Sequence, residues 1–384
     1  MKICFLMDSV YALGGAQKCT IDVANELSKN NDITLLCTVD IPKEKRVVHK
    51  INSKIKIKTI KWHTTLNSIL NIWTKVFIKI NQNTNLIKSK KILNFIYYKK
   101  NWNIKKIQNY IDENNFDVVI GVAATHTMIL SQLKKGNKKF IGWQHSNTRR
   151  YFKMEKQFLW HQEKIFKEAL NKIDYYVVLT ENDRELIKDY FDYNAICIPN
   201  PCCIVEDRIN FDRQKIILSV GRYDKVKGYD LLIKAFKKFV DANPQYKYKL
   251  YIVGDGPEKE KLNTLIHDFN LQDKVVLTGL TSNVVPYYLK SEFLVLSSRQ
   301  EGFPMVFLEA MECGLPIVTF DLPCVHEIVN DKFSYIAKYL DVEDLANGML
   351  KMVTSDLRKM RKEAKNRAKD FEIKKIIKKW EKLF

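Results

Sequence analysis

Short, continuous runs of apolar and β-branched residues recur along the chain, with enough residues between them for a helix. Because most runs do not alternate with polar residues, they indicate strands buried on both faces, as in parallel sheets. The apolar stripes of Ala16–Lys29 and Tyr229–Val240 predict intervening helices, so the class is α/β. The predicted strands are Lys2–Met7, Ile33–Val39, Phe116–Ala124, Lys139–Trp143, Tyr175–Thr180, Ala195–Pro199, Lys215–Gly221, Lys249–Gly254, Lys274–Gly279, Phe293–Ser298 and Pro316–Asp321.

The series of strands stops and restarts near the middle of the chain. The segment Asn200–Cys203 and the polar stretch Glu206–Gln214 resemble a linker, and a new strand begins at Lys215. A length of 384 residues also favours two domains. We therefore predict two doubly wound halves, residues 1–203 and 204–370, with ligands bound at the carboxyl ends of their strands, in a cleft between the halves.

Positive charge is concentrated in the first half. The net charge is +20, and residues 41–110 hold 17 Lys or Arg but one acidic residue, Glu44. Such a field indicates an anionic partner, although a general bias toward lysine would also produce basic surface. No apolar run approaches the roughly 20 residues of a membrane-spanning helix. None of the eight cysteines forms a Cys-x-x-Cys pair, so we expect reduced thiols and no zinc site.

Two glycines follow the first predicted strand. Gly14 and Gly15 precede the helix predicted from Ala16. Glycines at a strand-to-helix turn allow a ligand to approach the backbone, and a helix N-terminus favours anions. The alternative is a tight turn without a ligand, because the pattern is not the Gly-x-Gly-x-x-Gly of dinucleotide-binding proteins.

A basic loop follows the first strand of the second half. It runs from Gly221 to Gly228 and contains Arg222 and Lys227. Two cations at the carboxyl end of a strand could hold a diphosphate and stabilise the charge of a departing nucleotide. The alternative is a solvated basic loop.

The most informative segment contains two glutamates eight residues apart. Glu301 precedes a turn of Gly302, Phe303 and Pro304, and Glu309 lies inside the helix that this turn begins. A carboxylate among apolar neighbours needs hydrogen-bond donors, and a ribose diol supplies them. The alternative, two surface glutamates around a turn, does not fit the apolar surroundings.

Together these motifs resemble the family 4 retaining glycosyltransferases. The pair Glu301/Glu309 matches that family's Glu-x7-Glu motif, Gly221–Gly228 its Gly-Arg…Lys-Gly loop, and Gly14–Gly15 its N-terminal glycine loop. The resemblance implies the GT-B fold, with two Rossmann-like domains facing a central cleft, and a last helix, 371–384, that crosses back to the N-terminal domain. The chain departs from the family pattern after Asp321, where the glycines often found there are missing.

The resemblance also implies an activity. A nucleotide sugar would bind through Gly14, Gly15, Arg222, Lys227, Glu301, Gly302, Phe303, Pro304 and Glu309. Transfer would proceed with retention, without a metal or other cofactor, and with Glu301, Arg222 and Lys227 at the reacting centre. Because Trp143–Asn147 is similar to a segment of bacterial N-acetylgalactosaminyltransferases, His145 would contact the donor sugar. His126, which also follows a strand, competes for that role.

The basic stretch suggests where the acceptor is found. Ile69, Trp73, Val76, Phe77 and Ile80 share one helical face with lysines at its side. This pattern is typical of a helix on an anionic membrane, although the face could instead pack on the N-terminal domain. We therefore expect a lipid-linked or membrane-embedded glycan acceptor, and a cytoplasmic protein at the inner face of the membrane.

Other functions remain as alternatives. A nucleotide-sugar epimerase can share this fold, but the Glu301–Glu309 spacing and the Arg222/Lys227 loop argue against it. A non-catalytic protein that binds an anionic membrane or a nucleic acid would use the basic stretch alone. Because it would leave the two α/β halves and the four motif residues unexplained, we expect no nucleic-acid partner.

Overall fold

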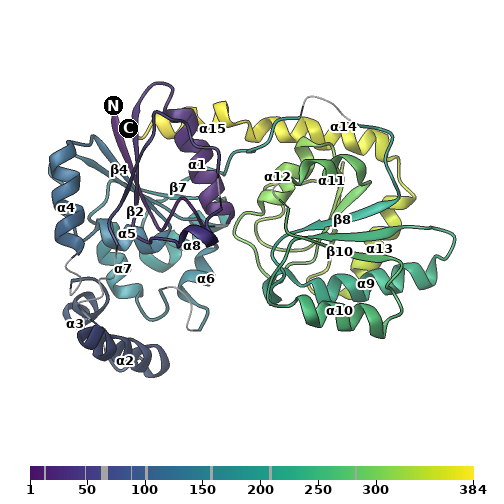
Figure 1. Cartoon of the computed structure of the whole chain (residues 1–384), viewed down its shortest axis with the longest axis horizontal. Coiled ribbons are helices and arrows are strands. Elements are labelled where there is room, and N and C mark those ends of the chain that lie inside the picture. The colour runs from purple at the N-terminus through teal and green to yellow at the C-terminus, as the bar shows by residue number, and fades with distance from the viewer. Residues whose placement is uncertain are drawn as a thin grey trace. The chain divides into compact units, whose positions relative to one another are not determined.

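The chain divides into two compact units, each with its own parallel sheet (Figure 1). Unit 1 comprises Met1–Pro201 and Ile373–Phe384, and unit 2 comprises Cys202–Glu372. These limits lie close to the boundaries predicted after residues 203 and 370. The computed structural model describes residues 1–12, 14–47, 49–61, 68–87, 89–99, 103–155, 159–206, 210–281 and 283–384.

Unit 1 contains a seven-stranded sheet in the order β3-β2-β1-β4-β5-β6-β7. Its strands are β1 (Lys2–Met7), β2 (Asp32–Cys37), β3 (Lys56–Thr59), β4 (Val118–Val122), β5 (Lys139–Trp143), β6 (Tyr175–Val178) and β7 (Ile196–Cys197). Its helices are α1 (Gly15–Leu27), α2 (Ser68–Thr84), α3 (Lys90–Asn94), α4 (Asn103–Asn114), α5 (Ala124–Leu130), α6 (Thr148–Phe152), α7 (Glu163–Leu170), α8 (Glu181–Phe191) and α15 (Ile373–Glu381), with a 3-10 turn at Lys43–Lys45 and a π-helical turn at Phe95–Lys99.

Unit 2 contains a six-stranded sheet in the order β10-β9-β8-β11-β12-β13. Its strands are β8 (Ile216–Val220), β9 (Lys249–Val253), β10 (Val275–Gly279), β11 (Phe293–Leu296), β12 (Ile317–Phe320) and β13 (Ser334–Ala337). Its helices are α9 (Tyr229–Ala242), α10 (Lys259–Asp268), α11 (Val285–Lys290), α12 (Met305–Glu312), α13 (Val342–Val353) and α14 (Leu357–Ala368), with 3-10 turns at Lys225–Lys227 and Lys369–Phe371.

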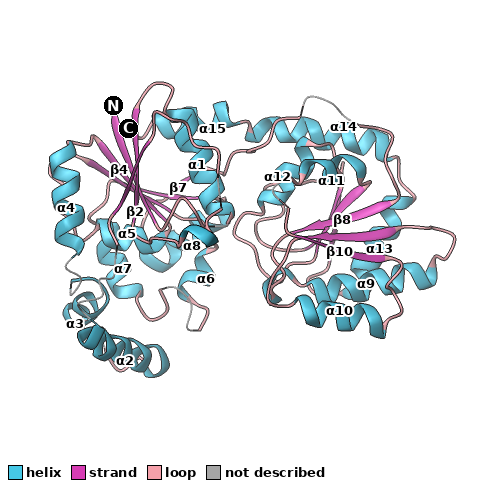
Figure 2. Cartoon of the chain, viewed as in Figure 1, coloured by secondary structure: helices cyan, strands magenta, loops and turns pink. Residues whose placement is uncertain are grey.

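The order of strands reverses once in each sheet. β1 lies between β2 and β4, and β8 lies between β9 and β11, in parallel pairs. Right-handed crossovers on the two sides of such a reversal place their helices on opposite faces, and helices flank both sheets in Figure 2. The prediction of two doubly wound α/β halves is therefore confirmed. Loops that diverge at the reversal leave room for a ligand there.

All eleven predicted strands occur in the two sheets, whereas the edge strands β3 and β13 were missed. Every residue of β8 is buried, as its continuous apolar run predicts. In β3, Lys56 and Lys58 alternate with Ile57 and Thr59, and all four residues are exposed. β3 and β13 lie at sheet edges, where one side has no neighbouring strand and charged residues discourage further pairing. These two edge strands lack the apolar run that identified the others, whereas the edge strands β7 and β10 contain one and were predicted.

The last helix, α15, packs in unit 1. Ile376, Ile377 and Trp380 form its buried face, as their helical register predicts. The Trp380 ring meets the Trp143 ring of β5 edge-on, with centroids 4.7 Å apart. The chain thus returns to the core of unit 1 after completing unit 2.

The basic stretch forms helices whose apolar side chains are partly exposed. On α2, Val76, Phe77 and Ile80 are 42%, 46% and 41% exposed. Further along, Ile92 and Phe95 are each 51% exposed. The side chains of Ile69 and Trp73 lie outside the described residues. Within the described part of the chain, no helix has the length and apolar character required to cross a bilayer.

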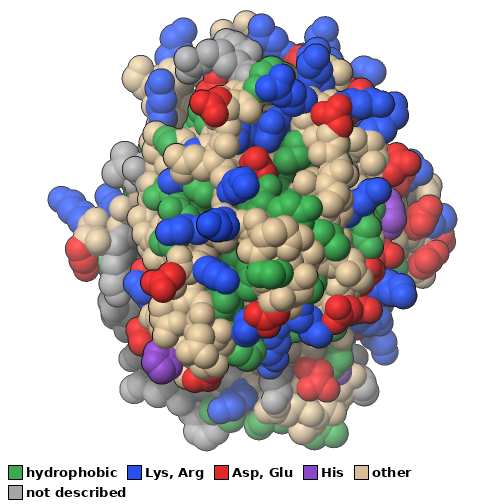
Figure 3. Space-filling model, turned by 90° about the vertical axis from the view of Figure 1, so that its right-hand side faces the viewer, with side chains coloured by type: hydrophobic (Ala, Val, Ile, Leu, Met, Phe, Trp, Pro, Cys, Tyr) green, Lys and Arg blue, Asp and Glu red, His purple; other side chains and the backbone are tan. Residues whose placement is uncertain are grey.

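Basic residues are mixed with acidic ones on one face of the molecule. On the face shown in Figure 3, Lys and Arg side chains lie among Asp and Glu side chains. The two signs of charge are interspersed on this face, whereas residues 41–110 hold 17 Lys or Arg and one acidic residue.

Candidate active site

The basic loop of unit 2 is a short turn at the carboxyl end of β8. The Asp224 carboxylate accepts hydrogen bonds from the backbone N–H groups of Val226 and Lys227 at 3.0 and 3.2 Å, which fixes the turn. Gly228 closes it with φ of 66°, and a Cβ at this position would lie 2.1 Å from the Ser297 carbonyl oxygen. Only glycine fits this close, left-handed position.

The loop after β11 is tied to this turn. The Ser297 hydroxyl donates to the Lys227 carbonyl oxygen at 3.0 Å, and the Arg299 N–H donates to the Val226 carbonyl oxygen at 2.7 Å. The Arg299 guanidinium also binds both carboxylate oxygens of Asp230, at 2.8 and 2.7 Å. Because β8 and β11 are neighbours at the strand reversal, these bonds join the two motif loops.

Lys227 and Glu301 meet where the loops join. Lys227 Nζ donates to Glu301 Oε1 at 2.7 Å, and the Ser298 hydroxyl donates to the same oxygen at 2.6 Å. The side chains of Lys227 and Glu301 are 25% and 10% exposed. We call Lys227, Ser298 and Glu301 the cluster. It places a cation beside a carboxylate, and both side chains are largely shielded from solvent but remain accessible to a ligand. Ser298 was not singled out in the sequence.

The other predicted residues of the two loops lie around this cluster. Arg222 is exposed and takes no part in the cluster's hydrogen bonds among described residues. Gly302 is partly exposed, and Phe303 is buried with its ring 6.1 Å from that of Phe371. Pro304 is the N-cap residue of α12. Phe303 thus anchors the turn, while Gly302 is accessible.

Glu309 is buried in α12, as the apolar pattern around it predicts, and is 7% exposed. The Tyr288 hydroxyl on α11 donates to Glu309 Oε2 at 2.9 Å. Burial and the neighbouring Glu309 carboxylate raise the pKa of Tyr288 well above its usual value, so the phenol keeps its proton. A protein side chain therefore supplies a hydrogen bond that the sequence led us to expect from a ligand. Nothing in the sequence around Tyr288 points to this role.

The predicted residues of unit 1 lie at the carboxyl ends of its strands. Gly14 is the N-cap residue of α1, whose first residue is Gly15. Leu13, which precedes this pair, lies outside the described residues. The backbone at Gly14 is extended, with φ of 170°, and a Cβ there would meet the end of the Gln17 side chain at 2.5 Å. Because that side chain can move, the turn does not strictly require glycine.

His145 lies directly beyond β5. Its ring packs on Trp143 with centroids 4.1 Å apart, and its two nitrogens are buried without a partner among the described residues. Burial lowers the pKa of His145 to about 3, so the imidazole is neutral at physiological pH. A neutral ring offers one N–H donor and one acceptor, as sugar hydroxyls require.

His126, the competing histidine, already has protein partners. Its Nε2 lies 3.1 Å from the Thr38 hydroxyl and 3.6 Å from an Asp8 carboxylate oxygen. Of the two histidines, His145 therefore has the greater unsatisfied capacity for hydrogen bonds. A buried polar group without a partner is uncommon and calls for a ligand or a water.

Metal ligands do not converge in the described ranges: no group of three or more His, Cys, Asp or Glu side chains there is placed to hold an ion. The eight cysteines are free thiols.

Comparison with known proteins identifies the family of unit 2. Residues 205–371 match the family model described as "Glycosyl transferases group 1". An uncharacterized glycosyltransferase of Haemophilus influenzae is 27% identical over 99% of this chain and 98% of its own length. A Campylobacter jejuni protein named "GalNAc-alpha-(1->4)-GalNAc-alpha-(1->3)-diNAcBac-PP-undecaprenol alpha-1,4-N-acetyl-D-galactosaminyltransferase" is 26% identical over 100% of this chain and 98% of its own length.

Solved structures identify the fold of the whole chain. Staphylococcus aureus TarM, in a complex that includes UDP, superposes with a TM-score of 0.76 and 17% identity over 100% of this chain and 99% of its own. Sucrose-phosphate synthase of Thermosynechococcus elongatus superposes with a TM-score of 0.75 and 16% identity over 100% and 98%. These neighbours are GT-B glycosyltransferases, and the resemblance inferred from the motifs is confirmed. The chain therefore has the GT-B fold, and its unit 2 is a glycosyl transferases group 1 domain.

Proposed function

We propose that this protein is a retaining, metal-independent transferase that moves a hexose or N-acetylhexosamine from a UDP-sugar to a glycan acceptor. The observation that carries the proposal is the cluster of Lys227, Ser298 and Glu301 at the strand reversal of the group 1 domain. TarM, a structural neighbour, was crystallised with UDP, which supports uridine as the base.

The charges of the cluster fit the departure of a nucleoside diphosphate. Negative charge grows on the leaving phosphate as the sugar–phosphate bond breaks, and the Lys227 ammonium can stabilise it. The exposed Arg222 guanidinium, on the same loop, can add a second cation. Because two side-chain cations neutralise much of the diphosphate charge, we propose that no metal ion is needed.

The carboxylates fit the sugars of the donor. Glu301, held by Lys227 and Ser298, would accept hydrogen bonds from hydroxyls of the transferred sugar. Glu309, held by Tyr288, would accept from the ribose hydroxyls, since a carboxylate can accept several hydrogen bonds. His145, with its neutral ring, would contact hydroxyls of the donor sugar. The acceptor hydroxyl would attack on the face of the leaving group, whose phosphate takes the proton.

The donor proposal is tested by screening UDP- and GDP-sugars for binding and turnover in EDTA, with NMR of the product anomer. We expect one UDP-sugar to react with retention, and Lys227→Ala and Glu309→Ala to lose turnover. Lys225→Ala is the matched control, because Lys225 lies on the same turn with an exposed side chain. Inversion, a strict metal requirement, or epimerisation of the sugar would each contradict part of the proposal.

We also propose that the acceptor is a lipid-linked or membrane-associated glycan of surface polysaccharide or oligosaccharide synthesis, met at the inner face of the membrane. The Campylobacter relative, whose name includes an undecaprenol-linked glycan, supports this acceptor class. Exposed Val76, Phe77 and Ile80 on α2, within the basic stretch, fit an anionic bilayer.

Vesicle sedimentation tests the membrane proposal. The wild type should bind anionic vesicles more strongly than zwitterionic ones and lose binding at high salt, because the lysine contribution is screened. Phe77→Asp should weaken binding, whereas Leu280→Asp, which changes a 64% exposed residue of unit 2, should not. Equal binding of the wild type and Phe77→Asp, or preference for RNA over vesicles, would contradict the proposal.

A further inference from the structure

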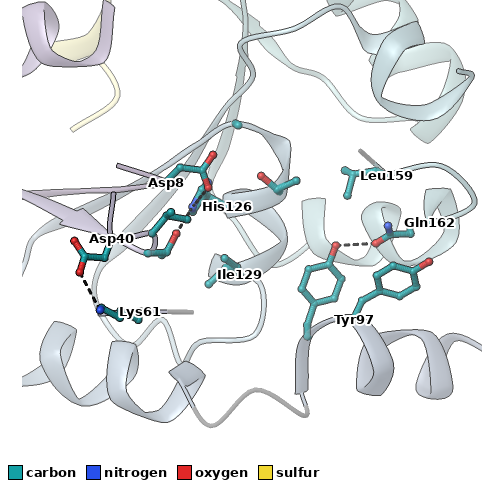
Figure 4. A pocket seen from close by; sticks show the side chains of 13 residues that line it. Asp8, Asp40, Lys61, Tyr97, His126, Ile129, Leu159 and Gln162 are labelled. Atoms are coloured by element: carbon teal, nitrogen blue, oxygen red, sulfur yellow. Dashed lines mark hydrogen bonds and ion pairs between the residues drawn. The ribbon is translucent and has the colours of Figure 1, made fainter. Parts of the chain in front are cut away.

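A cavity of about 590 Å³ opens in unit 1 (Figure 4). Its volume falls in the range of about 300–1,000 Å³ that is typical of small-molecule sites. The cavity lies at the carboxyl ends of β1, β2 and β4, where the strand order of the first sheet reverses. Neither the glycine pair nor His145 lines it.

One side of the cavity is polar. Asp8 follows β1, Thr38 follows β2, and His126 belongs to the helix that follows β4. His126 lies between Thr38 and Asp8, as its two contacts show. The Asp8 side chain is 58% exposed, so most of its carboxylate surface can meet a ligand. Adjacent strands thus place a carboxylate, a hydroxyl and an imidazole side by side.

The opposite side of the cavity is aromatic. Tyr97 and Tyr98 lie on the π-helical turn, with ring centroids 6.1 Å apart. The Tyr98 hydroxyl donates to Gln162 Oε1 at 2.7 Å, which anchors the wall. In Figure 4 Tyr97 and Gln162 stand across the cavity from Asp8 and His126, with Ile129 between the two sides. Single π-helical turns occur frequently at functional sites.

Backbone strain marks the same cavity. Ala123, one of its lining residues, has φ of 75° and ψ of 154°, a region otherwise occupied almost only by glycine. The Ala123 N–H donates to the Trp143 carbonyl oxygen at 2.7 Å, which holds this conformation. Strain of this kind persists where the surrounding structure enforces it, and it concentrates at ligand sites.

The charges of the cavity select the ligand class. Lys61 is paired with Asp40 at 2.9 Å, so Asp8, Asp40 and Lys61, which line the cavity, together carry one net negative charge. Burial lowers the pKa of His126, so this imidazole is neutral near pH 7 and does not offset Asp8. The Asp8 carboxylate therefore repels phosphates and uronates but accepts hydrogen bonds from hydroxyls.

We infer that this cavity binds a neutral pyranose ring of the acceptor glycan and rejects anionic sugars. The ring would pack against Tyr97 through its C–H face, and its hydroxyls would donate to the Asp8 carboxylate. The diphosphate of a lipid-linked acceptor is too anionic for this cavity and lies outside it. The inference rests on the proposed transferase function for its biological meaning, but binding can be tested without turnover.

The test measures binding of methyl glycosides to the full chain by saturation-transfer NMR. Neutral hexosides and N-acetylhexosaminides should bind the wild type, whereas the methyl glucuronide should not. Asp8→Asn should weaken neutral binding by about tenfold, because a hydrogen bond to a charged group is lost. Asp32→Asn is the matched control, since Asp32 is exposed at the amino end of β2, whereas Asp8 follows the carboxyl end of β1 in the same sheet. Asp8→Lys should lose the neutral glycosides and gain the glucuronide.

Three outcomes would overturn the inference: no binding of neutral glycosides to the wild type, equal binding to the wild type and Asp8→Asn, or glucuronide binding as strong as neutral binding.

Turnover of UDP-sugars is measured on the same samples. Loss of neutral binding in Asp8→Asn without any turnover would retain the cavity assignment and overturn the transferase proposal. Turnover of a UDP-sugar, together with glycoside binding that Asp8→Asn leaves unaltered, would retain the transferase proposal and overturn the cavity assignment. Because Asp8 is exposed, neither substitution should prevent folding.

Discussion

The Glu301→Gln substitution would release Lys227 from its carboxylate partner. In the structure, Lys227 Nζ donates to Glu301 Oε1 at 2.7 Å. If Lys227 also meets the donor diphosphate, the phosphate must compete with this carboxylate. Glutamine keeps the size of the side chain but removes its charge, so the diphosphate should meet an unpaired ammonium. We therefore expect tighter UDP binding but slower transfer.

The magnitude follows from the burial of the pair. Exposed ion pairs contribute about 0.2–1 kcal/mol, and breaking fully buried ones costs about 3–5 kcal/mol. Exposed fractions of 25% and 10% place the Lys227–Glu301 pair between these limits, at about 1–2 kcal/mol. Since about 1.4 kcal/mol corresponds to a tenfold change, the Kd of UDP should fall roughly 5- to 30-fold. Transfer should slow by about 10- to 100-fold, because Glu301 loses its charged hydrogen bonds to the donor sugar.

Isothermal titration calorimetry of UDP in EDTA measures the affinity, and a double-mutant cycle isolates the pair. In a Lys227→Met background, Glu301→Gln should leave the UDP affinity unchanged. Glu343→Gln is the matched control, because Glu343 pairs with Lys238 at 2.6 Å on the exposed surface of the same unit. An unchanged or weaker UDP affinity of Glu301→Gln with Lys227 intact would refute the idea that Lys227 meets the diphosphate.

Four further predictions concern stability. Tyr288→Phe should destabilise unit 2 by about 1.5–3 kcal/mol in urea unfolding, because Glu309 loses a hydrogen bond, whereas an equal effect of Tyr287→Phe would contradict this reason. Trp380→Ala should destabilise unit 1 by about 3–5 kcal/mol and change Trp143 fluorescence, and an unaltered unfolding midpoint would show that α15 is not docked on β5. Ala123→Gly should raise the free energy of unfolding by about 1 kcal/mol, because glycine relieves the positive φ; a lower melting temperature would contradict the strain. Burial lowers the pKa of His145 in the folded chain, so as the pH falls below about 6.5 the His145 imidazole is protonated in the unfolded chain but not in the folded one. Unit 1 should therefore be less stable by about 1 kcal/mol at pH 5.5 than at pH 7, and His145→Phe should reduce that difference.

The sequence predicted the central strands because consecutive apolar residues are enough to indicate their burial. A strand covered on both faces, such as β8, must be apolar at every position, so a continuous run identifies it without any tertiary information. The edge strand β3 has no such requirement, and its alternating lysines resemble a loop. The motif glutamates were also predicted from nearby residues, because Glu301 precedes a turn and Glu309 lies in the apolar helix that follows it.

The partners of those residues depend on contacts between distant segments. Lys227 and Glu301 are separated by 74 positions, and they meet because β8 and β11 are neighbours in the sheet. Tyr288 reaches Glu309 from another helix across 21 positions. Neither pairing leaves a periodic pattern in the chain, since each depends on which strands and helices are adjacent after folding.

The same distinction applies to unit 1. Its sequence predicted strands, a glycine turn and two candidate histidines, each from a few consecutive residues. Only the tertiary structure showed that His126 already contacts Thr38, and that Asp8 faces Tyr97 across a cavity. The sequence alone thus determined the α/β class, the two halves and the motif residues, because burial and turn chemistry are local. The fold decided which side chains share a site, because strand order brings together residues that lie far apart along the chain.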